Sequence, residues 1–237
     1  MAASPTTAGV TRRPKRRFYV LVALLTAGVV IVGFAPTFYM RTAELGPLKP
    51  VLAAHGAVFT VWLALFLAQT LLVPAGRTDL HRKLGWASLA WAGVMVALGI
   101  AAALDTLRGG QPPVPGDIRQ FAMLPFGDIA IFAGLVAWGA FLRQRSDWHK
   151  RLMTMATVSL LTPALARIPA LMPFGPPGFL SLTLVAVAGV IAFDWIAHGR
   201  PHPANLWSGA LIGLGKPILL FGVAATPAWL ALMDALR

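Results

Sequence analysis

The chain has 237 residues, of which 57% are apolar and only 12% are charged. An ordinary soluble domain has about a quarter charged residues, so this composition excludes a soluble globular protein and favours a polytopic membrane protein. The net charge of +12 would suggest nucleic-acid binding in a soluble chain, but here we expect the lipid bilayer, and no nucleic acid, as the partner. The absence of cysteine excludes disulfides, thiolate metal sites and iron–sulfur clusters.

Apolar runs of about 20 residues, the length needed to cross ~30 Å of hydrocarbon, recur along the chain. A basic segment, 1–17, precedes the first run, and because no clear cleavage site follows we expect that helix to be uncleaved. The predicted spans are 18–40, 50–74, 84–105, 120–142, 152–172, 178–197 and 205–233, with Gly and Pro concentrated between them. The sequence therefore predicts an all-α fold, a membrane bundle of about seven helices that forms one domain, 18–237.

The basic residues near the ends of these spans are unevenly divided between the two sides. One side has thirteen Lys and Arg and the other has five; the remaining two of the 20, Arg167 and Lys216, fall within spans. Cytoplasmic segments retain positive charge. We therefore expect the N-terminus in the cytoplasm and the C-terminus outside.

A charged octet with the pattern R-x-D-[L/W]-H-[K/R]-[K/R]-L occurs twice, at 77–84 and at 145–152. Each copy precedes a predicted span on the cytoplasmic side, which indicates a duplicated two-helix unit. We expect Asp79 and Asp147 to cap these helices and complement their dipoles, while the basic residues fix the topology. His81 and His149 occupy equivalent places, so the alternative is one haem b bound between the two imidazoles.

Ionisable residues inside membrane spans are costly and mark functional sites by default. By their depth in the spans, Asp128, Arg167 and Lys216 share the outer half of the bundle with His55. We expect Asp128 to pair with Arg167 or Lys216, which either ties helices together or forms part of a path for protons or a small solute. Asp194, in the sixth span, is a further residue of this intramembrane polar cluster.

The second span carries a polar and aromatic stripe on one face. His55, Phe59, Trp62, Phe66 and Gln69 follow one another at helical spacing. Such a stripe favours packing in the core. The alternative is a flat cavity that binds haem or quinone, with His55 and Gln69 as the polar groups at its two ends.

Several of these motifs together resemble a known group of proteins. H-G-x-x-F-x-x-W at 55–62, Gln69, the segments at 76–85 and 146–153, F-D-W at 193–195, H-P at 202–203 and T-P-A-W at 226–229 are similar to uncharacterised bacterial multi-pass inner-membrane proteins. The resemblance covers the second to seventh spans and implies the fold and membrane location, but no activity. The chain departs from the group at Lys216, where a polar but neutral residue is expected before Pro217, so the resemblance assigns Lys216 no role.

A looser similarity connects the chain to haem-b membrane cytochromes, which also place histidines on neighbouring helices. Those proteins use matched pairs, and His55 has only Met123 opposite it, so at most one haem would be bound by paired histidines. Motifs of hydrolases, P-loop proteins and zinc proteases are absent from the sequence, and we expect no enzyme. The first hypothesis is an accessory subunit or partner of a membrane complex; the alternatives are a haem-b redox protein and a carrier of protons or small solutes.

Overall fold

The computed structural model describes residues 12–110 and 116–237, with only the backbone described for 12–16. All regular elements in these ranges are helical. In chain order they are α1 (Arg12–Phe34), η2 (Ala35–Tyr39), η3 (Ala43–Leu45), α2 (Pro50–Leu72), α3 (Thr78–Arg108), α4 (Ile118–Phe121), α5 (Met123–Phe141), α6 (Ser146–Ser159), α7 (Thr162–Leu165), η4 (Pro169–Phe174), α8 (Gly175–His198), α9 (Pro203–Pro217), η5 (Ile218–Val223) and α10 (Pro227–Leu236). Residues 1–11 of the predicted basic segment, 1–17, lie outside the described residues. Its remaining residues, 12–17, belong to α1.

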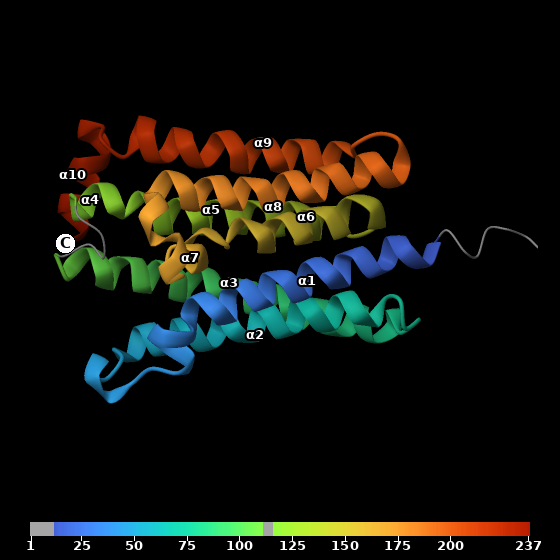
Figure 1. Cartoon of the computed structure of the whole chain (residues 1–237), viewed down its shortest axis with the longest axis horizontal. Coiled ribbons are helices and arrows are strands. Elements are labelled where there is room, and N and C mark those ends of the chain that lie inside the picture. Colours follow the sequence, from blue (N-terminus) through green and yellow to red (C-terminus); the bar gives the residue numbers. More distant parts are fainter. Residues whose placement is uncertain (1–11, 111–115) are drawn as a thin grey trace, which may run out of the picture.

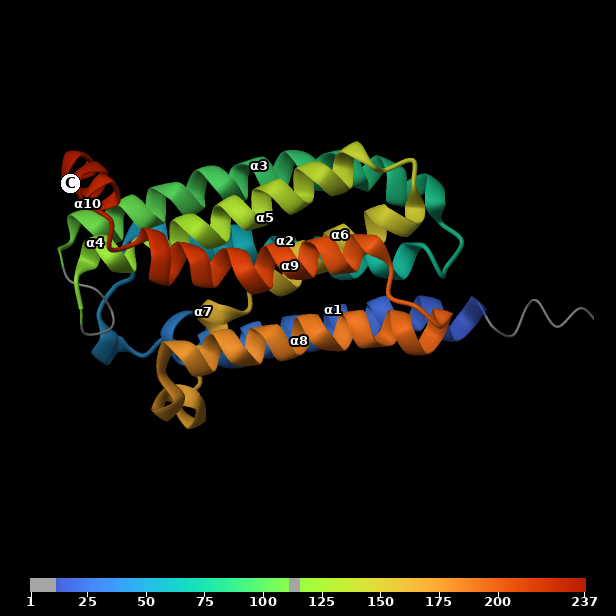
Figure 2. The same cartoon turned by 90° about the horizontal axis from the view of Figure 1, so that it is seen from above.

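The long helices run side by side in an elongated bundle (Figure 1). In the view from above, α3 and α5 form one outer layer, α1 and α8 form the other, and α2, α6 and α9 lie between them (Figure 2). The turns that lead into α3, α6 and α9 lie at one end, together with the start of α1 (Figures 1 and 2). We call this the octet end; the C-terminus lies at the opposite end.

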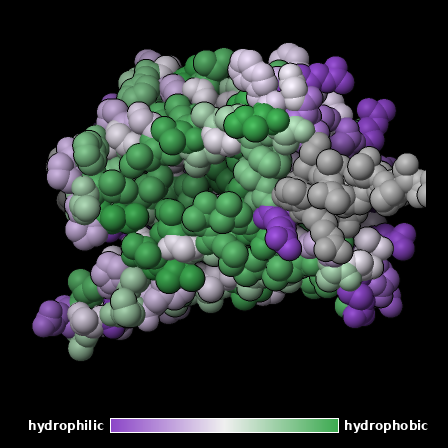
Figure 3. All heavy atoms as spheres, turned by 45° about the vertical axis from the view of Figure 1, so that its right-hand side comes forward, coloured by the Kyte–Doolittle hydropathy of each residue, from purple (hydrophilic) through white to green (hydrophobic). Residues whose placement is uncertain are grey.

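Six helices in the described residues are long and apolar enough to cross a membrane: Arg17–Tyr39, Pro50–Leu72, Thr78–Arg108, Ile118–Phe141, Pro169–His198 and Pro203–Val223. Apolar side chains cover the side of the bundle, while hydrophilic ones gather at the octet end (Figure 3). Large apolar side chains such as Ile196, Phe141 and Val185 have at least 66% of their surface exposed when no lipid surrounds the protein. Such exposure is expected where lipid is the solvent. The chain is thus an integral, multi-pass membrane protein.

The fifth predicted span, 152–172, is not a continuous helix. The helix α6 ends at Ser159, a turn at Leu160–Leu161 follows, and α7 and η4 continue in short pieces. At ~1.5 Å per residue the 14 residues of α6 extend only about 21 Å, less than the hydrocarbon thickness. Pro163 is one cause, because it has no N–H to donate to the carbonyl of Ser159, four residues earlier.

The seventh predicted span, 205–233, also differs from the prediction. The helix α9 ends at Pro217 and widens into the π-helix η5, and α10 begins only after a turn. In Figure 1 α10 lies across the end of the bundle instead of continuing α9. A proline again removes a backbone donor at the point where the regular helix ends.

The interrupted helix α6 lies at the centre of the bundle, in contact with α1, α5, α8 and α9. Its buried residues include Leu152, Met155 and Val158, all at most 1% exposed. The hydroxyl groups of Thr154, Thr157 and Ser159 donate to carbonyls three or four residues earlier in the same helix. These polar side chains are thereby satisfied within the helix, as burial in an apolar bundle requires.

The two octets begin α3 and α6 at the same end of the bundle, but the predicted capping by aspartate is wrong. Arg77 and Arg145 occupy the N-cap positions, with no side-chain hydrogen bond to the helix start. Asp79 and Asp147 lie two residues after these N-cap positions, in the first turns, where a negative charge still complements the helix dipole.

Candidate functional site

The centre of the bundle contains a buried ion pair. Lys216 Nζ lies 2.7 Å from Asp128 Oδ1, and both residues are only 7% exposed. The same ammonium group donates to the carbonyl oxygen of Ser159 at 2.5 Å and to Thr162 Oγ1 at 3.2 Å. Three oxygen atoms from α5, α6 and α7 therefore surround one cation supplied by α9.

The interruption of the fifth span creates this site. Pro163 leaves the Ser159 carbonyl without a helical donor, and a buried carbonyl without a partner costs about 1–3 kcal/mol. Lys216 supplies the missing donor. Its own position, immediately before Pro217 and η5, places a second helix irregularity beside the first; π-helical segments are frequent at functional sites.

Further residues extend this arrangement, which we call the Lys216 site (Asp128, Ser159, Thr162 and Lys216). Thr162 and Thr183 share a hydrogen bond of 2.9 Å between hydroxyl groups, which connects the site to α8. Gly127, next to Asp128, permits close packing: a Cβ there would lie 3.1 Å from Leu219 of η5. Sequence reasoning did not identify Ser159 or Thr162, although a proline four residues after a polar residue signals a free carbonyl.

Arg167 and His55 do not join the Lys216 site. The Arg167 guanidinium lies over the Phe34 ring of α1, 4.5 Å from its centroid, and donates to the Pro163 carbonyl at 2.7 Å. The His55 ring stacks on Phe59 at 4.1 Å between centroids, and its Nδ1 is buried without a hydrogen-bond partner among the described residues. Of the two partners expected for Asp128, the structure supplies Lys216.

Asp194 lies in a separate network nearer the octet end, so its grouping with Asp128 and Lys216 is corrected. Arg151 of α6 donates to both of its carboxylate oxygens, at 2.6 and 2.7 Å, and Asn205 of α9 donates at 2.6 Å. Both carboxylate and guanidinium are almost fully buried. Arg151 belongs to the second octet, where sequence reasoning gave it only a topological role.

A second contact of the same octet crosses the end of the bundle. His202 Nε2 lies 2.9 Å from Asp147 Oδ2. Burial raises the pKa of the Asp147 carboxyl, but the hydrogen bond from His202 and the hydrogen bonds from the backbone together outweigh burial and hold the pKa below its ordinary value. The second octet is therefore fastened to α8 and α9 through both Arg151 and Asp147.

His81 and His149 do meet, with ring centroids 6.2 Å apart and ring planes at 83°. His149 Nδ1 lies 2.8 Å from the Gly139 carbonyl. In one orientation of its amide, Gln69 donates to His81 and accepts from the Gly85 N–H at 2.9 Å.

These surroundings do not fit a haem. A bound macrocycle needs largely apolar walls, whereas both rings are only partly buried and lie next to exposed, charged octet residues: Arg82, Lys83, Arg145 and Lys150. The polar contacts of His81 and His149 instead hold α2, α3, α5 and α6 together at the octet end.

The stripe on α2 packs into the core. Trp62 is 2% exposed, donates from Nε1 to Thr157 Oγ1 at 3.3 Å, and meets Phe132 edge-on at 5.2 Å. Phe66 is also buried. The aromatic residues between His55 and Gln69 are thus used for packing against α5 and α6.

The chain matches no protein family model, no curated protein and no solved structure.

Proposed function

We propose that the protein is a proton carrier of the bacterial inner membrane, in which Asp128 and Lys216 exchange the proton. One observation carries the proposal. A lysine and an aspartate, both buried among helices that cross the membrane, meet at the point where a central helix is interrupted. Ionisable residues at such a depth are expensive and mark ion and proton paths.

Interrupted helices support the same function. In secondary transporters, discontinuous helices expose backbone carbonyls near the middle of the membrane, and these carbonyls coordinate the transported cation. Here the Ser159 carbonyl and the Thr162 hydroxyl face an ammonium group. The ammonium therefore occupies the kind of oxygen-lined position that a transported cation takes in those proteins.

The pair can move a proton in a balanced cycle. In the resting state Asp128 is ionised and Lys216 is protonated. A proton from one side neutralises Asp128, which releases its hold on Lys216, and the ammonium then loses its proton towards the other side. Transfer of the remaining proton from Asp128 to the neutral Lys216 amine restores the ion pair, so one proton crosses in each cycle.

The geometry favours this function over the two alternatives from the sequence. An accessory subunit would need no ionisable pair at a helix interruption, since apolar packing alone joins helices at least as well. A haem-b redox protein depends on His81 and His149, whose surroundings are polar and partly exposed. The visible absorption spectrum of the purified protein distinguishes the haem-b redox protein from the proton carrier, because bound haem b would give a Soret band.

Proton flux into liposomes tests the proposal. Purified protein is reconstituted in vesicles that contain a pH-sensitive dye, and a potassium diffusion potential, negative inside, is applied with valinomycin. We expect the native protein to acidify the interior, Asp128→Asn to abolish this flux, and Asp128→Glu to restore part of it. The control is Asp79→Asn, the same chemical change at an exposed octet position, which should leave the flux unchanged.

Two results would contradict the proposal. One is a flux through the native protein no greater than that of protein-free vesicles. The other is a flux through Asp128→Asn equal to that of the native protein.

A further inference from the structure

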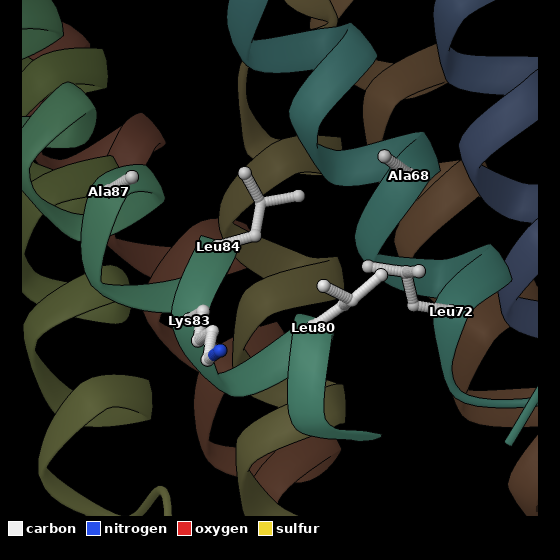
Figure 4. Close-up of a pocket in the computed structure, with 6 residues that line it drawn as sticks. All are labelled: Ala68, Leu72, Leu80, Lys83, Leu84 and Ala87. Atoms are coloured by element: carbon white, nitrogen blue, oxygen red, sulfur yellow. The ribbon is translucent and has the colours of Figure 1, made fainter. Parts of the chain in front are cut away.

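An open apolar groove of 590 Å³ lies between α2 and α3 at the octet end. Its walls are Ala68 and Leu72 of α2 and Leu80, Lys83, Leu84 and Ala87 of α3. Figure 4 shows the three leucines between the two helices, with Lys83 on the α3 side. The groove thus combines one cation with five apolar side chains. Such a surface suits an amphiphilic ligand, whose negative charge can bind the cation while its apolar part contacts the apolar side chains.

The second octet shows what such a surface binds when the protein itself supplies the partner. Lys83 corresponds to Arg151 in the repeat, and Leu80 corresponds to Trp148. Arg151 forms the bidentate pair with Asp194 of α8, and Trp148 packs on His202, which precedes α9, at 5.4 Å between ring centroids. In that copy, α8 provides a carboxylate for the cation, and His202 provides a ring that covers Trp148.

The first octet lacks this cover within the part of the chain that the structure describes. Leu80 is 36% exposed, and Arg82 and Lys83 are exposed. Neither cation has an ion-pair or hydrogen-bond partner among the described residues. The same sequence pattern is thus satisfied internally in one copy and left open towards the membrane in the other.

We propose that the groove binds an anionic phospholipid, with an acyl chain against Leu72, Leu80 and Leu84 and the headgroup phosphate on Lys83. The groove lies between two helices that cross the membrane, and its cation lies near the start of the second of these helices, Thr78–Arg108, at the level of headgroups. Basic residues next to membrane helices attract anionic lipids by about 1 kcal/mol each, so Lys83 alone accounts for roughly a fivefold preference.

Native mass spectrometry of the detergent-solubilised protein tests this site. The probes are phosphatidylglycerol and phosphatidylcholine with identical acyl chains, added in a titration. We expect the native protein to bind phosphatidylglycerol about fivefold more tightly, and Lys83→Gln to remove that preference. The matched control is Lys49→Gln, which removes the same charge at the opposite end, where Lys49 forms an exposed pair with Asp105, and should keep the preference.

A second variant tests the acyl-chain contact. Leu84→Ser should weaken the binding of both lipids while the preference for phosphatidylglycerol remains. Equal binding of the two lipids to the native protein would overturn the proposal, as would an unchanged preference in Lys83→Gln. The proposal would also be overturned if glycerol phosphate, which has no acyl chains, bound as tightly as the lipid, because the site would then recognise phosphate alone.

Discussion

Replacing Lys216 by methionine should destabilise the protein far more than an ordinary substitution does. Methionine keeps the length of the side chain but removes the ammonium that binds Asp128, Ser159 and Thr162. An unpaired buried charge costs about 3–5 kcal/mol, and the Ser159 carbonyl left without a donor costs about 1–3 kcal/mol more. Since contributions at one site are not additive, we expect a total of about 4 kcal/mol.

The assay is thermal unfolding in a single detergent, with native and variant proteins measured side by side. For a chain of this size, 1 kcal/mol corresponds to about 2–4 °C, so Lys216→Met should lower the unfolding temperature by roughly 8–16 °C. Asp128→Asn combined with Lys216→Met removes both charges and should recover at least half of the loss, about 2 kcal/mol; the interaction energy of the pair exceeds this value by the cost of the single Asp128→Asn variant, which is measured alongside. A double variant less stable than Lys216→Met alone, or a single variant within about 2 °C of the native protein, would refute the reasoning.

Two further predictions concern helix packing and the octet end. Gly33→Ala should destabilise the protein by about 1–3 kcal/mol or more, because its Cβ would overlap the Ala164 carbonyl oxygen. Gly28→Ala, whose Cβ would have nothing within 4 Å, should be neutral or stabilising. Equal losses of the two variants in thermal unfolding would contradict the packing of Gly33 on Ala164. Asp147→Asn should cost at most about 1 kcal/mol, since the pair with His202 is partly exposed. The pKa of Asp147 is lowered from 3.8 in the folded protein. The stability difference between the native protein and Asp147→Asn should therefore be fully present above pH 3.8 and disappear as the pH falls through the folded-state pKa. A stability difference that grows on acidification would be inconsistent with the hydrogen bond between His202 and Asp147.

The sequence predicted the parts of the fold that depend on composition and length. The six continuous spans follow from apolar runs, and the common end of the two octets follows from the repeated pattern at 77–84 and 145–152. The interruption after Ser159 was not predicted, because the window 152–172 is apolar enough for a span. Pro163 and Pro169 were the signals of an interruption in this window. Membrane helices tolerate proline when other groups satisfy the freed carbonyls, so a proline alone does not predict where a helix ends. The group that satisfies the freed Ser159 carbonyl is Lys216, which is distant in the sequence.

The composition of the site was predictable only in part. Because burying a charge is costly, Asp128 and Lys216 each needed a partner of opposite charge inside the bundle. In the structure they pair with each other. Asp194 was grouped with them as another ionisable residue inside a predicted span, whereas its partner is set by the rotation of α6, which turns Arg151 inward. Rotation of one helix against another depends on side-chain packing across the whole interface, and spacing along a single helix does not determine it.

The most direct test of the central claim is infrared difference spectroscopy of the reconstituted protein during a pH jump. A proton carrier that uses this pair must protonate the Asp128 carboxylate in the course of its cycle. We predict that acidification converts a carboxylate band of the native protein into a protonated carboxyl band, and that this change is missing in Asp128→Asn and retained in Asp79→Asn. A difference spectrum identical in the native protein and Asp128→Asn would contradict the claim that the buried pair exchanges a proton.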